Sequence, residues 1–111
     1  MTSRKARKRT AERPAPPTAV EDFPELALVV QGYLHEDYAV EHGSAHQAVA
    51  AYRCDASDEE RTRFDREVER FLRLVDGATI TAIRKILVQE FGSAWAPRSL
   101  AELRNVLRAP A

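Results

Sequence analysis

The sequence predicts an all-α protein, a single compact bundle of about five helices that follows a disordered, basic N-terminal tail. Apolar residues recur at spacings of three and four over most of the chain, which is the period of an amphipathic helix. No long segment alternates with the two-residue period of a strand. Three serines, Ser44, Ser57 and Ser99, each precede a Gln or Glu by three positions, the spacing of a helix-capping box.

Residues 1–20 form the predicted tail, ahead of a helical domain at 21–111. The tail carries six Lys and Arg residues against Glu12 and then a proline cluster, with almost nothing apolar to bury, so disorder is expected. Two interpretations remain open, an arm that binds nucleic-acid phosphates and a solvated tail without a role. Translation of the native product from near Val20 is a further hypothesis.

The first helix is expected from Pro24 to between Leu34 and Asp37. Pro24 suits a first turn, where its missing N–H costs nothing, and Asp22 or Phe23 can cap the helix. Glu25 stands at capping-box spacing from Asp22. Within a helix of this length, Tyr33 and Asp37 lie one turn apart on the same face.

The other helices follow from the same signals. Residues 40–43 end the first helix or form a turn, with Gly43 suited to a positive φ, and Ser44 starts the second helix. The remaining helices are expected at about 58–75, 79–91 and 100–107. Four aromatic residues are expected in the core or at its edge: Tyr33, Tyr38, Tyr52 and Trp95. Cys54 is expected to be a small buried apolar residue.

The cysteine count and the lack of a long apolar run limit the class of protein. A single cysteine excludes an internal disulfide and a cysteine-based zinc site, and the sequence shows no signal peptide or membrane-spanning run. A cytoplasmic protein is therefore expected. His42 and His46 have metal-ligand spacing, but Gly43 and Ser44 between them predict two separate helices, so no metal and no cofactor is expected. His35, Glu36 and Asp37 lack an accompanying nucleophile or phosphate loop, so no enzymatic activity is expected.

The zero net charge conceals an uneven distribution. Residues 21–69 carry thirteen acidic residues against four arginines, whereas residues 70–111 carry seven cations against three acids. An acidic surface of this kind either keeps the protein in solution or meets a protein partner with a basic groove, as nucleases have for binding phosphates.

A run of motif residues between 22 and 44 resembles the small helical immunity proteins of contact-dependent growth inhibition. Residues 23–26 match the family pattern outright, and further matches follow in step over a resemblance that spans about residues 20–107. Four positions depart from the pattern, mostly by similar residue types: Leu34, Glu36, Tyr38 and His42. The motif positions are Phe23, Pro24, Glu25, Leu26, Tyr33, His35, Asp37, Gly43 and Ser44, with Glu41 also in step.

The resemblance implies a protein that binds the C-terminal toxin domain delivered by a neighbouring cell and blocks it without catalysing a reaction. Combined with the acidic block, it points to a nuclease toxin as partner. The residues expected to face the toxin are Glu36, Asp37, Glu41, Asp58, Glu59 and Glu60. Charge reversal at 58–60 is expected to weaken binding without changing thermal unfolding. The alternative is a small helical nucleic-acid-binding or regulatory protein that uses the basic tail.

Overall fold

The computed structural model describes residues 20–111, and this part of the chain is helical and contains no strand, which confirms the predicted all-α class. The predicted tail lies outside the described residues except for Val20, which begins a short 3-10 helix. The elements are η1 (Val20–Asp22), α1 (Pro24–Tyr33), α2 (Tyr38–His42), α3 (Ala45–Asp55), α4 (Asp58–Leu74), α5 (Ile80–Lys85), η2 (Ile86–Glu90) and α6 (Leu100–Leu107).

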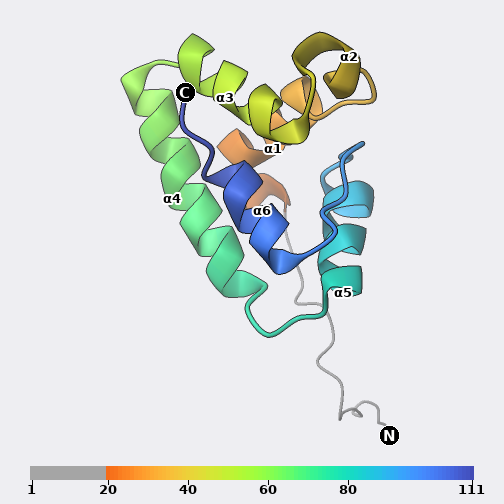
Figure 1. Cartoon of the computed structure of the whole chain (residues 1–111). Helices are drawn as coiled ribbons and strands as arrows, with labels where there is room; N and C mark the ends of the chain where they lie inside the picture. The colour runs from red at the N-terminus through yellow and green to blue at the C-terminus, as the bar shows by residue number, and fades with distance from the viewer. Residues whose placement is uncertain (1–19) are drawn as a thin grey trace, which may run out of the picture.

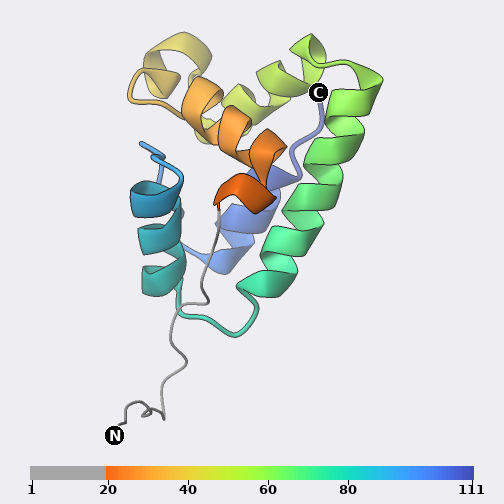
Figure 2. The ribbon, with the colours of Figure 1, turned by 180° about the vertical axis from the view of Figure 1, so that it is seen from behind.

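The helices surround one core. In Figure 1, α4 forms one flank and α5 the other, α6 lies between them, and α2 and α3 close the upper end. The reverse view in Figure 2 shows α1 on the opposite side of the bundle from α6. Helix α1 packs on both α3 and α4, while α6 packs on α3. The described chain therefore forms a single bundle with its hydrophobic residues enclosed.

Aromatic rings bring together segments that are distant in the sequence. The rings of Phe23 and Phe71 meet edge to face with centroids 5.8 Å apart, and those of Phe71 and Phe91 do so at 5.6 Å. Edge-to-face geometry is favoured because a positive ring edge meets a negative ring face. Phe64 and Phe71 of the longest helix, α4, are fully buried, as expected for the apolar face of an amphipathic helix.

A buried arginine joins α3, α4 and the C-terminal end. The guanidinium of Arg53 donates to the carbonyl of Leu107 (3.1 Å) and to that of Ala109, and it pairs with Asp65 at 2.8 Å. It also lies over the ring of Phe64, 5.1 Å from the centroid. Since a buried charge needs both a counter-charge and hydrogen-bond acceptors, these contacts explain why an arginine is tolerated there.

This arrangement overturns the expectation for Cys54, which is exposed. At the end of α3 the inward position is taken by Arg53, because its hydrogen-bond acceptors lie at the C-terminal end of the chain. The adjacent residue therefore points outward. The aromatic predictions are confirmed: Tyr52 and Trp95 are buried, and Tyr33 and Tyr38 pack against the core.

The predicted helix starts are confirmed where a serine caps. Ser44, Ser57 and Ser99 each accept a hydrogen bond from the backbone N–H three residues on. A complete capping box forms at Ser57, whose own N–H donates to the Glu60 carboxylate at 2.8 Å. The acceptors therefore satisfy N–H groups that have no partner within the helix.

Two segments differ from the predicted elements. Residues 40–43 were expected to end the first helix or form a turn, but Tyr38–His42 form the separate short helix α2 and Gly43 follows it. The predicted helix at 79–91 begins as α5 and changes to a π-helical turn over η2, where the N–H of Phe91 donates to the carbonyl of Ile86. Such a turn inserts one residue into the helical repeat, which a search for regular spacing does not detect.

Candidate partner-binding surface

The opening motif of α1 is part of the core. Phe23 and Leu26 are buried, and Pro24 occupies the first turn as predicted. The N–H of Leu26 donates to the buried carboxylate of Glu67 on α4 at 2.8 Å. Of the two predicted cap residues, Asp22 and Phe23, the N-cap is Phe23, and no side-chain hydrogen bond caps the helix there. A carboxylate from a distant helix thus fills the role that a local cap usually has.

Glu25 is also buried rather than part of a capping box. Its carboxylate accepts a hydrogen bond from the Tyr52 hydroxyl at 2.9 Å and lies 3.5 Å from Nε of Arg63. Burial, together with the hydrogen bond to Glu25, raises the pKa of the Tyr52 phenol above its usual value. The motif residues 23–26 therefore hold α1 against α3 and α4, which is a structural role.

Tyr33 does not pair with Asp37, contrary to the expectation. Helix α1 ends at Tyr33, so Asp37 is not one turn further along the same helix. The Tyr33 hydroxyl instead donates to Asp55 at the end of α3 (2.9 Å), and its ring stacks on His42 with centroids 5.8 Å apart. Tyr33 consequently links α1 to both α2 and α3.

The link from α1 to α2 is built around a histidine. Nδ1 of His35 accepts the backbone N–H of Asp37 at 3.1 Å, and its Nε2 lies 3.0 Å from the Glu41 carboxylate. Asp37 is the N-cap of α2, yet its carboxylate makes no capping bond. The side chain of His35 therefore accepts the N–H hydrogen bond at the start of α2, and the Asp37 side chain is exposed.

The positive φ expected at Gly43 is confirmed. Gly43 has φ +94° and ends α2, and a Cβ at this position would collide with Oε1 of Gln47. Ser44 then caps α3 through the N–H of Gln47 at 3.1 Å. As predicted, His42 and His46 lie on separate helices. Among residues 20–111, no three His, Cys, Asp or Glu side chains are arranged to hold a metal ion.

The first group of predicted partner-facing carboxylates lies on and just before α2. Glu36, Asp37 and Glu41 are all exposed. Glu41 lies near the rings of His35 (3.0 Å) and His42 (3.8 Å). No ion pair joins Glu36 or Asp37 to another residue of the described part of the chain. These two carboxylates are therefore open to a partner.

The second group lies at the start of α4 and is largely engaged within the helix. Asp58 pairs with Arg61, and Glu60 closes the capping box. The hydrogen bond from the Ser57 N–H lowers the pKa of Glu60. Asp58 and Glu59 also line a shallow hollow with Arg63 and Arg66. Their charge is thus offset by neighbouring arginines, and reversing Glu60 is expected to disturb the cap as well as any binding.

The structure places the two groups apart. In Figure 1, α2 and the start of α4 lie at opposite ends of the upper edge, with α3 running between them. A finer division of the sequence locates the acidic charge: residues 20–52 contain six acidic residues and no Lys or Arg. The net charge summed over 21–69 does not show this, because it includes four arginines that all follow residue 52. The cation-free stretch forms η1, α1, α2 and most of α3.

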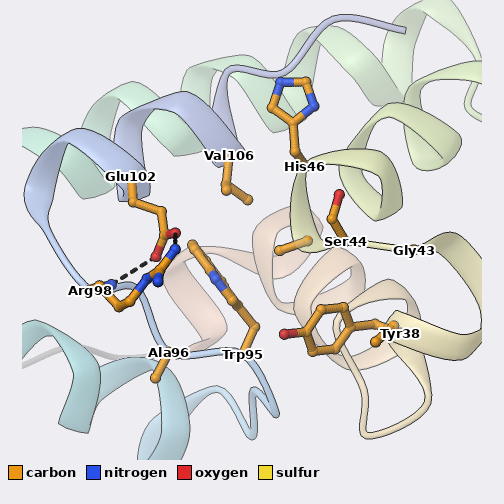
Figure 3. Close-up of a pocket in the computed structure, with 11 residues that line it drawn as sticks. Tyr38, Gly43, Ser44, His46, Trp95, Ala96, Arg98, Glu102 and Val106 are labelled. Carbon is orange, nitrogen blue, oxygen red and sulfur yellow. Dashed lines mark hydrogen bonds and ion pairs between the residues drawn. The ribbon is translucent and has the colours of Figure 1, made fainter.

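A groove adjoins α2. It has a volume of about 380 Å³ and lies between α2, the first turn of α3, the loop before α6, and α6 itself. Figure 3 shows Trp95 between Tyr38 on one side and Glu102 on the other, with Ser44 and His46 on the α3 side. The pairing partner of Glu102 is Arg98, whose N–H donates to the carboxylate at 2.7 Å and lowers its pKa.

This arrangement defines a class of protein. A small helical bundle that presents open carboxylates and a groove on its surface has features suited to binding another macromolecule. Within residues 20–111, no helix is long and apolar enough to cross a membrane.

Comparison with known families agrees with this class. The profile described as CdiI immunity protein matches residues 22–107, which is most of the chain. The chain therefore belongs to the family of immunity proteins of contact-dependent growth inhibition, a family that neutralises toxins and is generally non-enzymatic. No curated protein and no solved structure matches the chain.

Proposed function

We propose that this protein binds the C-terminal toxin domain of a contact-dependent growth inhibition system in the cytoplasm and blocks it, and that the toxin is a nuclease. The observation that carries the first part is the family match over residues 22–107. The protein acts by occupying the toxin, so its inhibition needs no catalytic residue and no cofactor.

The nuclease assignment is supported by charge. A nuclease must bind phosphates and therefore carries a cationic groove. The carboxylates at 36, 37, 41, 58, 59 and 60 give this protein a negative surface that can occupy such a groove and speed the encounter with it. In this proposal both carboxylate groups attract the toxin, while close contact is made by the carboxylates that the protein does not use internally.

The test is growth rescue. Expression of the toxin domain encoded beside this gene is expected to stop growth, and co-expression of this protein is expected to restore it. A toxin domain from an unrelated system is the matched control and should remain lethal, because an inhibitor that fits one surface does not fit another. Failure to rescue from the neighbouring toxin would contradict the proposal.

The nuclease part has its own readout. Purified toxin domain should degrade DNA or RNA, and stoichiometric immunity protein should stop the degradation. A toxin that kills without cleaving nucleic acid, and is still neutralised, would retain the immunity function and reject the nuclease assignment.

A further inference from the structure

Helix α2 carries the most exposed large apolar side chain among residues 20–111. Val40 is 88% exposed, against 52% for Leu28 and 44% for Val88. Helix α2 has no buried residue of its own and packs on α3. Within residues 20–111 its outer side is therefore an unpartnered helix face, and covering Val40 with an apolar surface would be favourable.

The charges around Val40 define what can cover it. Glu36, Asp37 and Glu41 are exposed on and beside the same short helix, and the chain from residue 20 to residue 52 contains no Lys or Arg to offset them. An exposed apolar side chain on the same short segment as exposed carboxylates fits a surface that has an apolar hollow with cations at its rim. The start of α4 fits such a partner less well, because its own arginines offset its carboxylates.

The groove extends this face. Tyr38 and Ala39 of α2 form one side of it, and Trp95 and Val106 lie across it. Its volume of about 380 Å³ and its aromatic lining suit the aliphatic stem of a long basic side chain, and Glu102, paired with Arg98, is the carboxylate that lines it. The groove and α2 therefore adjoin through Tyr38 and Ala39, so one partner surface can cover both.

We infer that the toxin docks on α2 and the adjoining groove, with Val40 as the apolar anchor and with basic toxin residues over Glu36, Asp37 and Glu41. This inference rests on the proposed function and names the surface that carries it out. A second copy of this chain is disfavoured as the occupant, since placing two α2 faces together would oppose three carboxylates with three more.

The experiment measures the Kd between the full chain and the purified toxin domain encoded beside its gene. Val40→Arg is expected to raise the Kd at least about a hundredfold, because it places a cation against a cationic rim and removes the anchor. The matched control is Val88→Arg, the same change at another exposed valine, on η2, which should stay within about threefold of the native Kd.

A second pair separates the two carboxylate groups. The double variant Glu36→Lys with Asp37→Lys should raise the Kd about a hundredfold and lower the association rate at low salt. Asp58→Lys with Glu59→Lys makes the same charge change at α4 and should change the Kd less than about tenfold, through long-range attraction alone. Because Glu36 and Asp37 are exposed and make no capping bond, the α2 variants should unfold like the native protein.

A third variant tests the groove without changing charge. Ala39→Phe places a ring in the groove from an exposed position and should weaken toxin binding about tenfold or more while circular dichroism and unfolding stay native. Thr81→Phe, an exposed position on α5, is its control and should have no effect.

The outcomes are distinct. If the native protein does not bind the neighbouring toxin, the proposed function and this inference both fail. If it binds tightly and the α2 and groove variants bind equally tightly, the docking surface is elsewhere and only the inference fails. If light scattering shows that Val40→Arg converts a dimer of the free protein to a monomer while toxin binding is unchanged, the face is a self-association surface and the inference is overturned.

Discussion

At the scale of single residues, a carboxylate in the acidic stretch is not always a surface charge. Glu25 and Glu67 are buried, one bonded to the Tyr52 hydroxyl and the other to the backbone N–H of Leu26. Both contacts join segments at least 27 residues apart, so no local spacing rule could identify them. The family motif includes Glu25 but not Glu67, and only the fold shows that both carboxylates stabilise the core.

The positive φ of Gly43 is a local requirement that the sequence did predict. Gly43→Ala should lower the free energy of unfolding by about 1–3 kcal/mol, because an alanine at φ +94° is strained and its Cβ meets the Gln47 side chain. The measurement is urea unfolding followed by circular dichroism.

Gly32→Ala is the matched control for that change. Gly32 lies within α1, and a Cβ there meets nothing within 4 Å. The substitution should therefore stabilise the protein by about 0.5–1 kcal/mol. Equal effects of the two substitutions would show that backbone conformation at Gly43 is not the cause.

At the scale of elements, the bounds of helices that begin with a capping residue and carry an apolar stripe were predicted closely. Helix α4 runs from Asp58 to Leu74, against an expected 58–75. Helix α2 was missed because it has five residues, no side-chain cap and no buried side chain, so neither spacing nor capping marks it. Its position depends on tertiary contacts, including the stacking of Tyr33 on His42 and its packing on α3.

The capping box of α4 makes stability depend on pH in a defined direction. The hydrogen bond from the Ser57 N–H lowers the pKa of Glu60 in the folded state. A lowered pKa gives stability that is present above the unfolded value, about 4.3, and is lost as the pH falls through the folded value. The same sign applies to Glu69, whose pKa Arg108 lowers, and to Glu102. Stability should therefore decline below about pH 4.5.

Glu60→Gln tests the assignment of part of that decline. Glutamine keeps a side-chain oxygen for the Ser57 N–H but does not titrate, so the loss of stability between about pH 4.5 and pH 3 should be shallower than in the native protein. Urea unfolding at a series of pH values gives the slope. Glu59→Gln, beside it but outside the capping box, should keep the native slope. Identical slopes in the two variants would reject the capping box as a source of the pH dependence.

At the scale of the whole molecule, the sequence predicted the class, the helical bundle and the sign of the surface charge, but not where that charge is open. Composition gives only totals, and the arrangement that leaves Glu36 and Asp37 open while Asp58 is paired depends on the fold. The groove brings Tyr38 of α2 near Trp95 of the loop before α6, which no spacing rule predicts. Of the motif residues, only Gly43 and Ser44 line this groove.

The basic N-terminal residues decide between the two functional readings. Removing residues 1–19 deletes six cations and one acid from a chain of zero net charge, which leaves a net charge of −5. Since the core and the family match lie within residues 20–111, the truncated protein should still rescue growth and should bind a cationic toxin somewhat faster at low salt. Stopped-flow association rates at rising salt concentration measure this.

The opposite result is equally clear. If the protein worked through phosphate contacts of residues 1–19, the full chain should shift DNA or RNA in a gel, with an affinity that falls steeply with salt. Truncation should then abolish both the shift and the biological effect, because a body with net charge −5 is repelled by phosphates. Growth rescue that persists after truncation is therefore the expected outcome for an inhibitor that acts through its acidic helical domain. Loss of rescue would show that the function depends on residues 1–19.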